Sequence, residues 1–347
     1  MDIDDLYADD ASYSDYIVDA DLVQGLVQLF PNIPNPQFKS NIQQDVVKLS
    51  YQWLENFVAV MPTGGGKSLS WLLPAVLDPP DAITFVIIPN CDLLLDQMAH
   101  TCAFNIPTCQ WTVADQDIQD SKVVYLALES AASHAFSVYW AHREDATSWL
   151  VIDEAHQVLS QSQFRHLFEK IKRLAAVPIP HIFLTATLPI HMEHDFLLEV
   201  GMPQSTRIIR APTSHPNISY NLVRFDSNVT ARLRLIRDLA KLMEDSFMSQ
   251  GQIVIIFAQE IPDVEEIADA LQCSRSHSRM NATHRAQDYN AWVSGQVQWM
   301  AATTTLTHGI DHPNISVCIF LHLVYGLLYL VQGSGHLLCQ GGQSYCI

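Results

Sequence analysis

Short apolar runs alternate with longer mixed segments along most of the chain. Each run is rich in Val, Ile, Leu or aromatic residues, which is typical of parallel strands that are covered on both faces. The expected strands are Phe57–Met61, Thr84–Ile88, Val123–Ala127, Trp149–Ile152 and His181–Leu184, followed by Tyr220–Phe225, Ile253–Phe257, Val297–Ala301 and Ser316–Leu321.

The segments between these runs are long enough for crossover helices. The pattern therefore predicts an α/β protein with parallel sheets flanked by helices. A chain of 347 residues suits two such lobes, and a hydrophobic content of 48% supplies their cores. We expect an acidic, disordered tail over 1–25, a first lobe over 26–210, a linker over 211–218 and a second lobe over 219–347.

Charge changes this picture in one respect. The formal net charge is −18, and the first 21 residues hold eight Asp and no Lys or Arg, which leaves −10 for the rest. Because phosphate contacts need Lys and Arg, the balance weighs against tight nucleic-acid binding, although it leaves room for a local basic groove.

Cysteine usage and hydropathy point to an intracellular protein without a membrane span. The seven cysteines are scattered with no CxxC pair, so neither a zinc site nor a disulfide framework is expected. The acidic start is unlike a secretory signal. The apolar run Ile315–Val331 is interrupted by Ser316 and His322, and it predicts a buried strand followed by the start of a helix.

A glycine-rich loop follows the first expected strand. Pro62-Thr-Gly-Gly-Gly-Lys-Ser68 lies between that strand and the helix-like Leu69–Leu77. Glycines let backbone N–H groups curl around phosphate oxygens, and the helix N-terminus adds partial positive charge. Lys67 is expected to reach the β- and γ-phosphates and Ser68 to ligate Mg²⁺. The candidate nucleotide-binding residues of this loop are Thr63, Gly64, Gly65, Gly66, Lys67 and Ser68.

An acidic box ends the fourth expected strand. Trp149-Leu-Val-Ile-Asp-Glu-Ala-His156 is an apolar strand that runs into two carboxylates. In a nucleotide motor Asp153 holds Mg²⁺ and Glu154 polarises the attacking water. We expect His156 to couple the nucleotide to the second lobe. An N-capping role for the two acids is compatible with this interpretation.

With these two elements, the chain resembles the superfamily 2 helicases, and within them the RecQ-like group, particularly its fungal-type members. Further segments match the family's motifs in order over roughly residues 35–335. They are Phe38-Lys39-Ser40 with Gln43, Val86-Ile-Ile-Pro-Asn90, Leu184-Thr-Ala-Thr-Leu-Pro189, the interlobe bridge Ile209–Asn217, Ile253–Ala258, Cys273–His277 and Ala302–Asp311.

The resemblance implies two RecA-like lobes that bind ATP and Mg²⁺ between them and move along single-stranded or partly duplex DNA, 3′ to 5′. It implies a nuclear location if the source is eukaryotic. Gln43 is expected to read adenine. The resemblance also assigns ATP contacts to Gly309, Asp311 and Gln332, and nucleic-acid contacts to Pro89, Asn90, Thr185, Thr187 and Thr304.

The chain departs from the family in three places. The last motif reads Gln332-Gly-Ser-Gly-His-Leu-Leu-Cys-Gln-Gly341, so that His336 and Cys339 replace two arginines. An arginine finger is worth about 10³–10⁵ in rate in related switches, and neutral His lacks its fixed fork of donors. The loop at Gln157–Arg165 is short. The chain also stops without the family's zinc-binding and winged-helix modules, which suggests a truncated second lobe with a frameshifted or alternatively spliced tail at Leu337–Ile347.

Three functions remain open at this point. The leading hypothesis is an ATP-dependent DNA helicase of RecQ type, acting in DNA repair or recombination. The second is a degenerate, hydrolysis-deficient ATP-binding or interaction protein derived from such a helicase. A simple ATPase or P-loop kinase leaves Thr185–Pro189 and Gly309–Asp311 without a role.

Two other residue types have plainer expected roles. Histidines such as His277, His284, His308, His312 and His322 lack metal-ligand spacing and are expected on the surface or in packing. The tryptophans are expected in the core, with Trp111 as the one candidate for base stacking.

Overall fold

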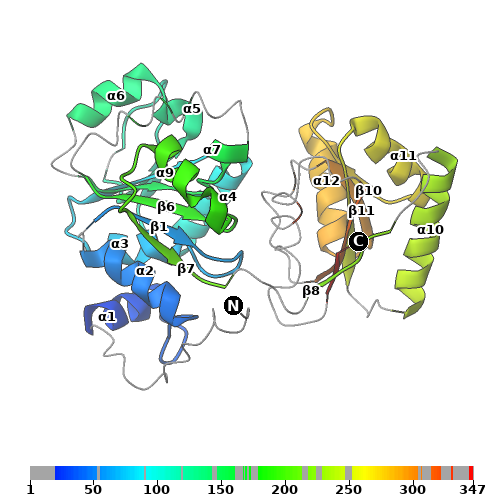
Figure 1. Cartoon of the computed structure of the whole chain (residues 1–347), viewed down its shortest axis with the longest axis horizontal. Helices are drawn as coiled ribbons and strands as arrows, with labels where there is room; N and C mark the ends of the chain where they lie inside the picture. Colours follow the sequence, from blue (N-terminus) through cyan, green and yellow to red (C-terminus); the bar gives the residue numbers. More distant parts are fainter. Residues whose placement is uncertain are drawn as a thin grey trace.

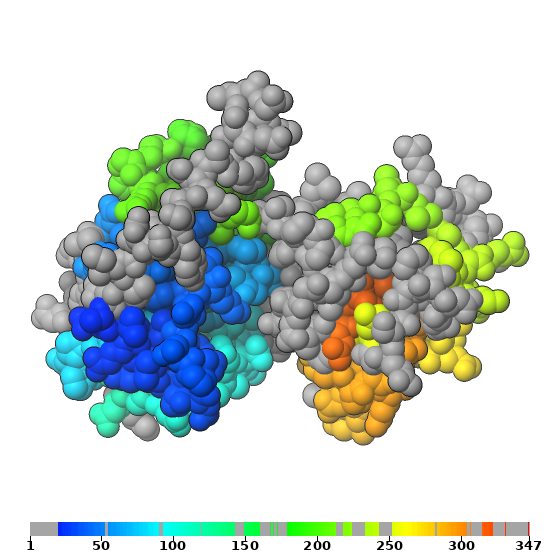
Figure 2. Space-filling view, turned by 90° about the horizontal axis from the view of Figure 1, so that it is seen from below, coloured from blue at the N-terminus to red at the C-terminus, as the bar shows by residue number. Residues whose placement is uncertain are grey.

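A computed structural model describes most of the chain. The described residues are 20–52, 55–89, 91–118, 120–142, 147–160, 167, 169, 172, 179–212, 218–223, 229–246, 252–303, 306, 314–321, 330 and 344–346. They form two α/β lobes that lie side by side, one drawn from blue to green and the other from yellow-green to orange (Figures 1 and 2).

The first lobe is built on a parallel sheet. Within the described residues, the sheet has seven strands in the order β3-β4-β2-β5-β6-β1-β7. The strands are β1 Phe57–Val60, β2 Ile83–Ile88, β3 Thr108–Gln110, β4 Val123–Ala127, β5 Thr147–Ile152, β6 His181–Thr185 and β7 Arg207–Arg210. All pairings between them are parallel.

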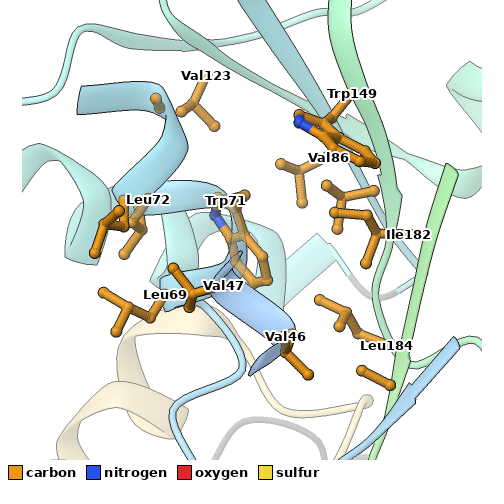
Figure 3. Packing of buried hydrophobic residues seen from close by; sticks show 14 of the residues in the cluster. Val46, Val47, Leu69, Trp71, Leu72, Val86, Val123, Trp149, Ile182 and Leu184 are labelled. Carbon is orange, nitrogen blue, oxygen red and sulfur yellow. The ribbon is translucent and has the colours of Figure 1, made fainter. Parts of the chain in front are cut away.

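Helices cover both faces of this sheet, because successive side chains of each strand point to opposite sides. One cluster packs the sheet against the first four helices, α1 Ala20–Leu29, α2 Asn41–Gln52, α3 Leu69–Leu77 and α4 Cys91–Ala103. The other packs it against α5 Leu128–Ala131, α6 His134–Ala141, α7 Gln157–Ser160 and α9 Glu193–Val200, which follows the 3₁₀ turn η4 Ile190–Met192. Figure 3 shows Trp71 of α3 among valines and leucines of the first cluster.

The second lobe repeats the design on a smaller scale. Within the described residues its sheet has the order β10-β11-β9-β12-β13-β8. Its strands are β8 Ile218–Tyr220, β9 Ile253–Ala258, β10 Ser274–Ser276, β11 Trp299–Thr303, β12 Ile315–Phe320 and β13 Ser344–Cys346. Helices α10 Val229–Ser246 and α11 Ile261–Leu271 pack on one face, and α12 Ala282–Val293 packs on the other.

Most expected strands are confirmed, with two corrections. The run Tyr220–Phe225 is not the strand, because β8 ends at Tyr220 and residues 221–223 have no regular structure. β8 pairs with β13 from the far end of the chain, so its position depends on a partner that the local pattern does not reveal. The strand expected at Val297–Ala301 lies two residues later, as β11.

The expectation of a strand at Ser316–Leu321 is met by β12, and the helix expected after it falls mostly on residues outside the described part. No helix among the described residues is long and apolar enough to cross a membrane.

Candidate nucleotide-binding site

The strand order brings the two candidate motifs to one edge of the first sheet. β6 lies between β1, which leads into the glycine loop, and β5, which leads into the acidic box. Hydrogen bonds continue past the strand ends, from Met61 N to Thr185 O at 2.9 Å and from Ala155 N to Leu184 O at 3.0 Å. The carboxyl ends of these strands are where open α/β sheets bind their ligands.

The glycine loop is a tight turn that needs at least two of its glycines. Gly64 and Gly66 have φ of 73° and 75°, in the left-handed region that glycine adopts without a steric penalty. At Gly65 a Cβ would lie 2.8 Å from Pro62 O, to which the Gly65 N–H donates at 3.0 Å. Lys67 Nζ donates to Met61 O at 3.4 Å. The loop leads directly into α3, and the N-terminus of that helix favours the binding of anions.

Gln43 on α2 holds the loop from the side. Gln43 is only 3% exposed to solvent. Its Nε2 donates to Gly66 O at 3.1 Å, and its Oε1 accepts from Lys39 N at 2.6 Å. Lys39 Nζ in turn donates to Gly64 O at 3.0 Å. Gln43 and Lys39 thus both contact the glycine loop, and the reading of adenine by Gln43 stays a prediction.

The acidic box places the first carboxylate inside the protein and the second in a partly buried position. Asp153 is 5% exposed, and its Oδ1 accepts from Glu154 N at 2.9 Å. Burial raises the pKa of Asp153 to about 6, Glu154 adds to that rise, and the charge of Lys67 opposes it. Glu154 has a φ of 48°, a strained conformation for a residue with a Cβ. With this backbone conformation at Glu154, the chain turns directly after Asp153.

His156 joins the acidic box to β6. Its ring is buried, and Nδ1 lies 2.9 Å from Thr185 Oγ1 and 3.3 Å from Glu154 Oε2. Thr185 Oγ1 also accepts from Thr187 N at 3.0 Å. One hydroxyl therefore connects the box to the segment that follows β6.

The donor set fits a magnesium nucleotide. Mg²⁺ prefers hard oxygen ligands, and the Ser68 hydroxyl and the Asp153 carboxylate belong to the two motifs on either side of β6. The charge of Lys67 acts on Asp153, so the cation and the carboxylate share one electrostatic neighbourhood. Among the described residues there is no cluster of His, Cys, Asp and Glu that would hold a metal on protein ligands alone.

The remaining predicted residues divide into two groups. Pro89, Thr185 and Thr187 are buried, so nucleic-acid contacts by these side chains stay a prediction. Asn90, Thr304, Gly309, Asp311, Gln332, His336 and Cys339 lie outside the described residues.

The expectation for Trp111 is wrong. Its side chain is fully buried, with ring centroids 5.0 Å from Phe136 and 5.6 Å from Tyr139. It therefore packs in the core and offers no face to a base. The core placement expected for other tryptophans is confirmed for Trp71, Trp140, Trp149, Trp292 and Trp299.

The second lobe has its own charged cluster where β10 ends. Arg275 pairs with Glu265 and, at 2.6 Å, with Asp269. The buried His277 places Nε2 2.6 Å from Glu265 Oε1. Arg275 N also donates to Asp288 Oδ2 at 3.0 Å. The guanidinium of Arg275 is thus neutralised by carboxylates of its own lobe.

Two helicase family models and several curated helicases match the chain. The model of the DEAD/DEAH box helicase family matches residues 40–196, and that of the helicase conserved C-terminal domain matches residues 234–338. ATP-dependent DNA helicase Q5 of Mus musculus is 26% identical over 338 residues, covering 89% of this chain and 34% of that protein. ATP-dependent helicase SGS1 of Saccharomyces cerevisiae is 26% identical over 336 residues, covering 90% of this chain and 22% of that protein.

The chain thus carries the two domains that these helicase models describe, and its curated relatives include RecQ-family helicases at 26% identity. It spans about a third or less of the length of these two relatives.

Solved structures support the fold. Helicase MrfA bound to DNA has a TM-score of 0.72 at 16% identity, covering 95% of this chain and 48% of that one. S. cerevisiae Dbp5 bound to RNA and ADP BeF3 has a TM-score of 0.69 at 15% identity, covering 95% of this chain and 87% of that one. The chain thus has the two RecA-like lobes that these helicases share.

Proposed function

We propose that the chain is an ATP-dependent DNA helicase of RecQ type that binds Mg-ATP between its two lobes and moves 3′ to 5′ on single-stranded DNA. One observation carries the proposal: the glycine loop and the acidic box lie on either side of β6, joined by hydrogen bonds to it. The matches to two helicase family models support a helicase over other proteins with a site of this kind. A nuclear role in repair or recombination follows the RecQ-like relatives.

Each residue has a physical task in this proposal. The loop's backbone N–H groups and Lys67 bind the phosphates, and Gln43 holds the loop and reads adenine. Ser68 and Asp153 hold Mg²⁺, which neutralises charge on the phosphates when bound. Glu154 orients the attacking water. His156 and Thr185 pass the change at the box to the segment after β6.

DNA binding is proposed to rely on backbone contacts, so little sequence preference is expected. Pro89, Asn90, Thr187 and Thr304 are the proposed contact positions. Pro89 and Thr187 are buried, so contacts by their side chains would require a local rearrangement. The net charge of −18 restricts binding to a local basic surface, and the Lys and Arg contacts to phosphates there should make binding weaken as salt rises.

DNA-stimulated ATP hydrolysis tests the proposal. The purified chain should release phosphate faster with single-stranded DNA, and Lys67→Ala should lower that rate about 100-fold or more, as for loss of a donor to developing charge. Lys172→Ala is the matched control, because Lys172 forms a surface pair with Glu169. Equal rates in wild type and Lys67→Ala would contradict the proposal.

A second candidate function rests on His336 and Cys339. Without the arginines of the last motif, the chain would bind ATP and hydrolyse it poorly, acting as a nucleotide-dependent interaction protein. Strong nucleotide binding with negligible hydrolysis, with or without DNA, would favour this candidate.

A further inference from the structure

Ser68 has a side-chain partner outside the recognised motifs. Its Oγ donates to Gln97 Oε1 at 3.3 Å. Gln97 belongs to α4, on the same face of the sheet as α3. None of the sequence motifs described above includes Gln97.

The chemistry of a hydroxyl ligand gives this contact a purpose. A serine that binds a cation uses an oxygen lone pair, so its single hydrogen must go to an acceptor elsewhere. The amide oxygen of Gln97 is such an acceptor. Because the hydrogen points to Gln97, the lone pairs of Ser68 are directed elsewhere. Partners of this kind orient metal ligands and tune their affinity.

A buried chain of hydrogen bonds fixes α4 behind Gln97. Thr101 Oγ1 donates to Gln97 O at 2.9 Å and lies 2.7 Å from Tyr125 OH. Since the one hydrogen of Thr101 is used, Tyr125 must donate to Thr101. Trp71 Nε1 then donates to Tyr125 OH at 3.0 Å. Burial raises the pKa of Tyr125 to about 12, which keeps this donor protonated.

This series of hydrogen bonds leads back to Ser68, at the end of the glycine loop. Trp71 lies one helical turn after Ser68, and the backbone N–H of Trp71 donates to the backbone O of Ser68 at 3.2 Å. Figure 3 shows the Trp71 ring held among Val47, Leu72 and Val86 in the core. The bonds thus run from Ser68 to α4, through Tyr125 on β4, and back to α3. Gln97 takes part in this ring twice, since its side-chain oxygen accepts from Ser68 and its backbone oxygen accepts from Thr101.

We propose that Gln97 is a positioning residue that accepts the hydrogen of Ser68 and thereby directs the Ser68 oxygen toward Mg²⁺. This proposal rests on the proposed Mg-nucleotide site. It assigns to Gln97 an effect on magnesium affinity that acts through Ser68, with no contact to the nucleotide.

Magnesium titration of nucleotide binding tests it. The full chain would be titrated with MgCl₂ in the presence of a fluorescent ADP analogue, and again with the analogue in EDTA. Gln97→Leu, which removes the acceptor, should weaken apparent magnesium affinity about 10–100-fold and leave binding in EDTA unchanged. Gln97→Glu, which keeps an oxygen acceptor, should stay close to wild type.

Gln116→Leu is the matched control, because Gln116 is exposed and bonds only to the nearby Val113 O in the described structure. A Gln97→Leu titration equal to wild type would overturn the proposal, as would an equal loss of binding in EDTA. Wild-type binding with no magnesium dependence would overturn the proposed function as well.

Discussion

The two lobes share an architecture but use the ends of their strands differently. In the first lobe, Lys67 and Ser68 on a partly exposed loop lie across β6 from Asp153, so polar groups are available to a phosphate. In the second lobe, Arg275 is bound by Glu265 and Asp269 of the same lobe. A cation neutralised in this way is a poor phosphate ligand. Under the proposed function, the first lobe binds the nucleotide, and any catalytic charge from the second lobe has to come from residues other than Arg275.

Restoring charge to the second lobe should have the largest effect. If the last motif limits turnover, changing His336→Arg and Cys339→Arg together should raise ATP hydrolysis, by up to about 10³–10⁵-fold. Steady-state phosphate release measures this, and His284→Arg, at an exposed position of α12, controls for added charge. An unchanged rate would mean that the lack of arginines at positions 336 and 339 does not limit ATP hydrolysis.

Removing the water-orienting group should cut hydrolysis while sparing binding. Glu154→Gln keeps the size of the side chain but removes its charge, and a loss of about 10²–10⁴-fold in phosphate release is expected. Glu169→Gln, on an exposed residue of the same lobe, should have no such effect. Wild-type turnover in the Glu154→Gln chain would show that Glu154 is not the group that activates the water.

Breaking the link across β6 should lower stability. Thr185→Val preserves shape but leaves His156 Nδ1 and Thr187 N without this partner. Loss of these buried bonds should cost about 1–3 kcal/mol of unfolding free energy in urea denaturation. Thr112→Val, in an exposed turn, should cost less. Equal losses would show that the strand-end network is no stronger than a surface bond.

The ion cluster of the second lobe should produce the smallest effect on stability, and that effect should disappear in acid. Burial alone would raise the pKa of Glu265, but bonds from His277 and Arg275 outweigh it and hold the pKa below the ordinary 4.5. The ionised carboxylate thus stabilises the lobe above about pH 4.5, and this contribution is lost as the pH falls through the folded pKa.

Thermal unfolding of wild type and Glu265→Gln over roughly pH 3 to 7 measures it. The two melting temperatures should differ at neutral pH and converge in acid, and the exposed Glu260→Gln serves as the control. A difference that is constant with pH would assign the effect to packing.

The sequence predicted the central strands better than the edges. β2, β4 and β6 are buried on both faces, so their apolar runs mark them clearly. β3 and β10 are short and polar, and they lie at sheet edges, where no apolar run is needed. Their existence depends on neighbours distant in sequence.

The candidate site shows the same division. The glycine loop and acidic box could be placed because each follows a buried strand and carries its chemistry in consecutive residues. Gln97 and Tyr125 could not, because they join the site through a helix and a strand whose spatial order the sequence does not state. Trp111 was wrongly named as a candidate for base stacking, because the partners that bury it, Phe136 and Tyr139, come from α6 and are distant in sequence.

Equilibrium binding of a fluorescent ATP analogue, with and without Mg²⁺, tests the central claim most directly. The claim is that the glycine loop and acidic box of the first lobe hold a magnesium nucleotide. Wild type should bind the analogue in a magnesium-dependent manner, and Lys67→Ala should weaken that binding about tenfold or more, a loss of about 1.4 kcal/mol or more. Equal, magnesium-independent affinity in the two chains would contradict the account.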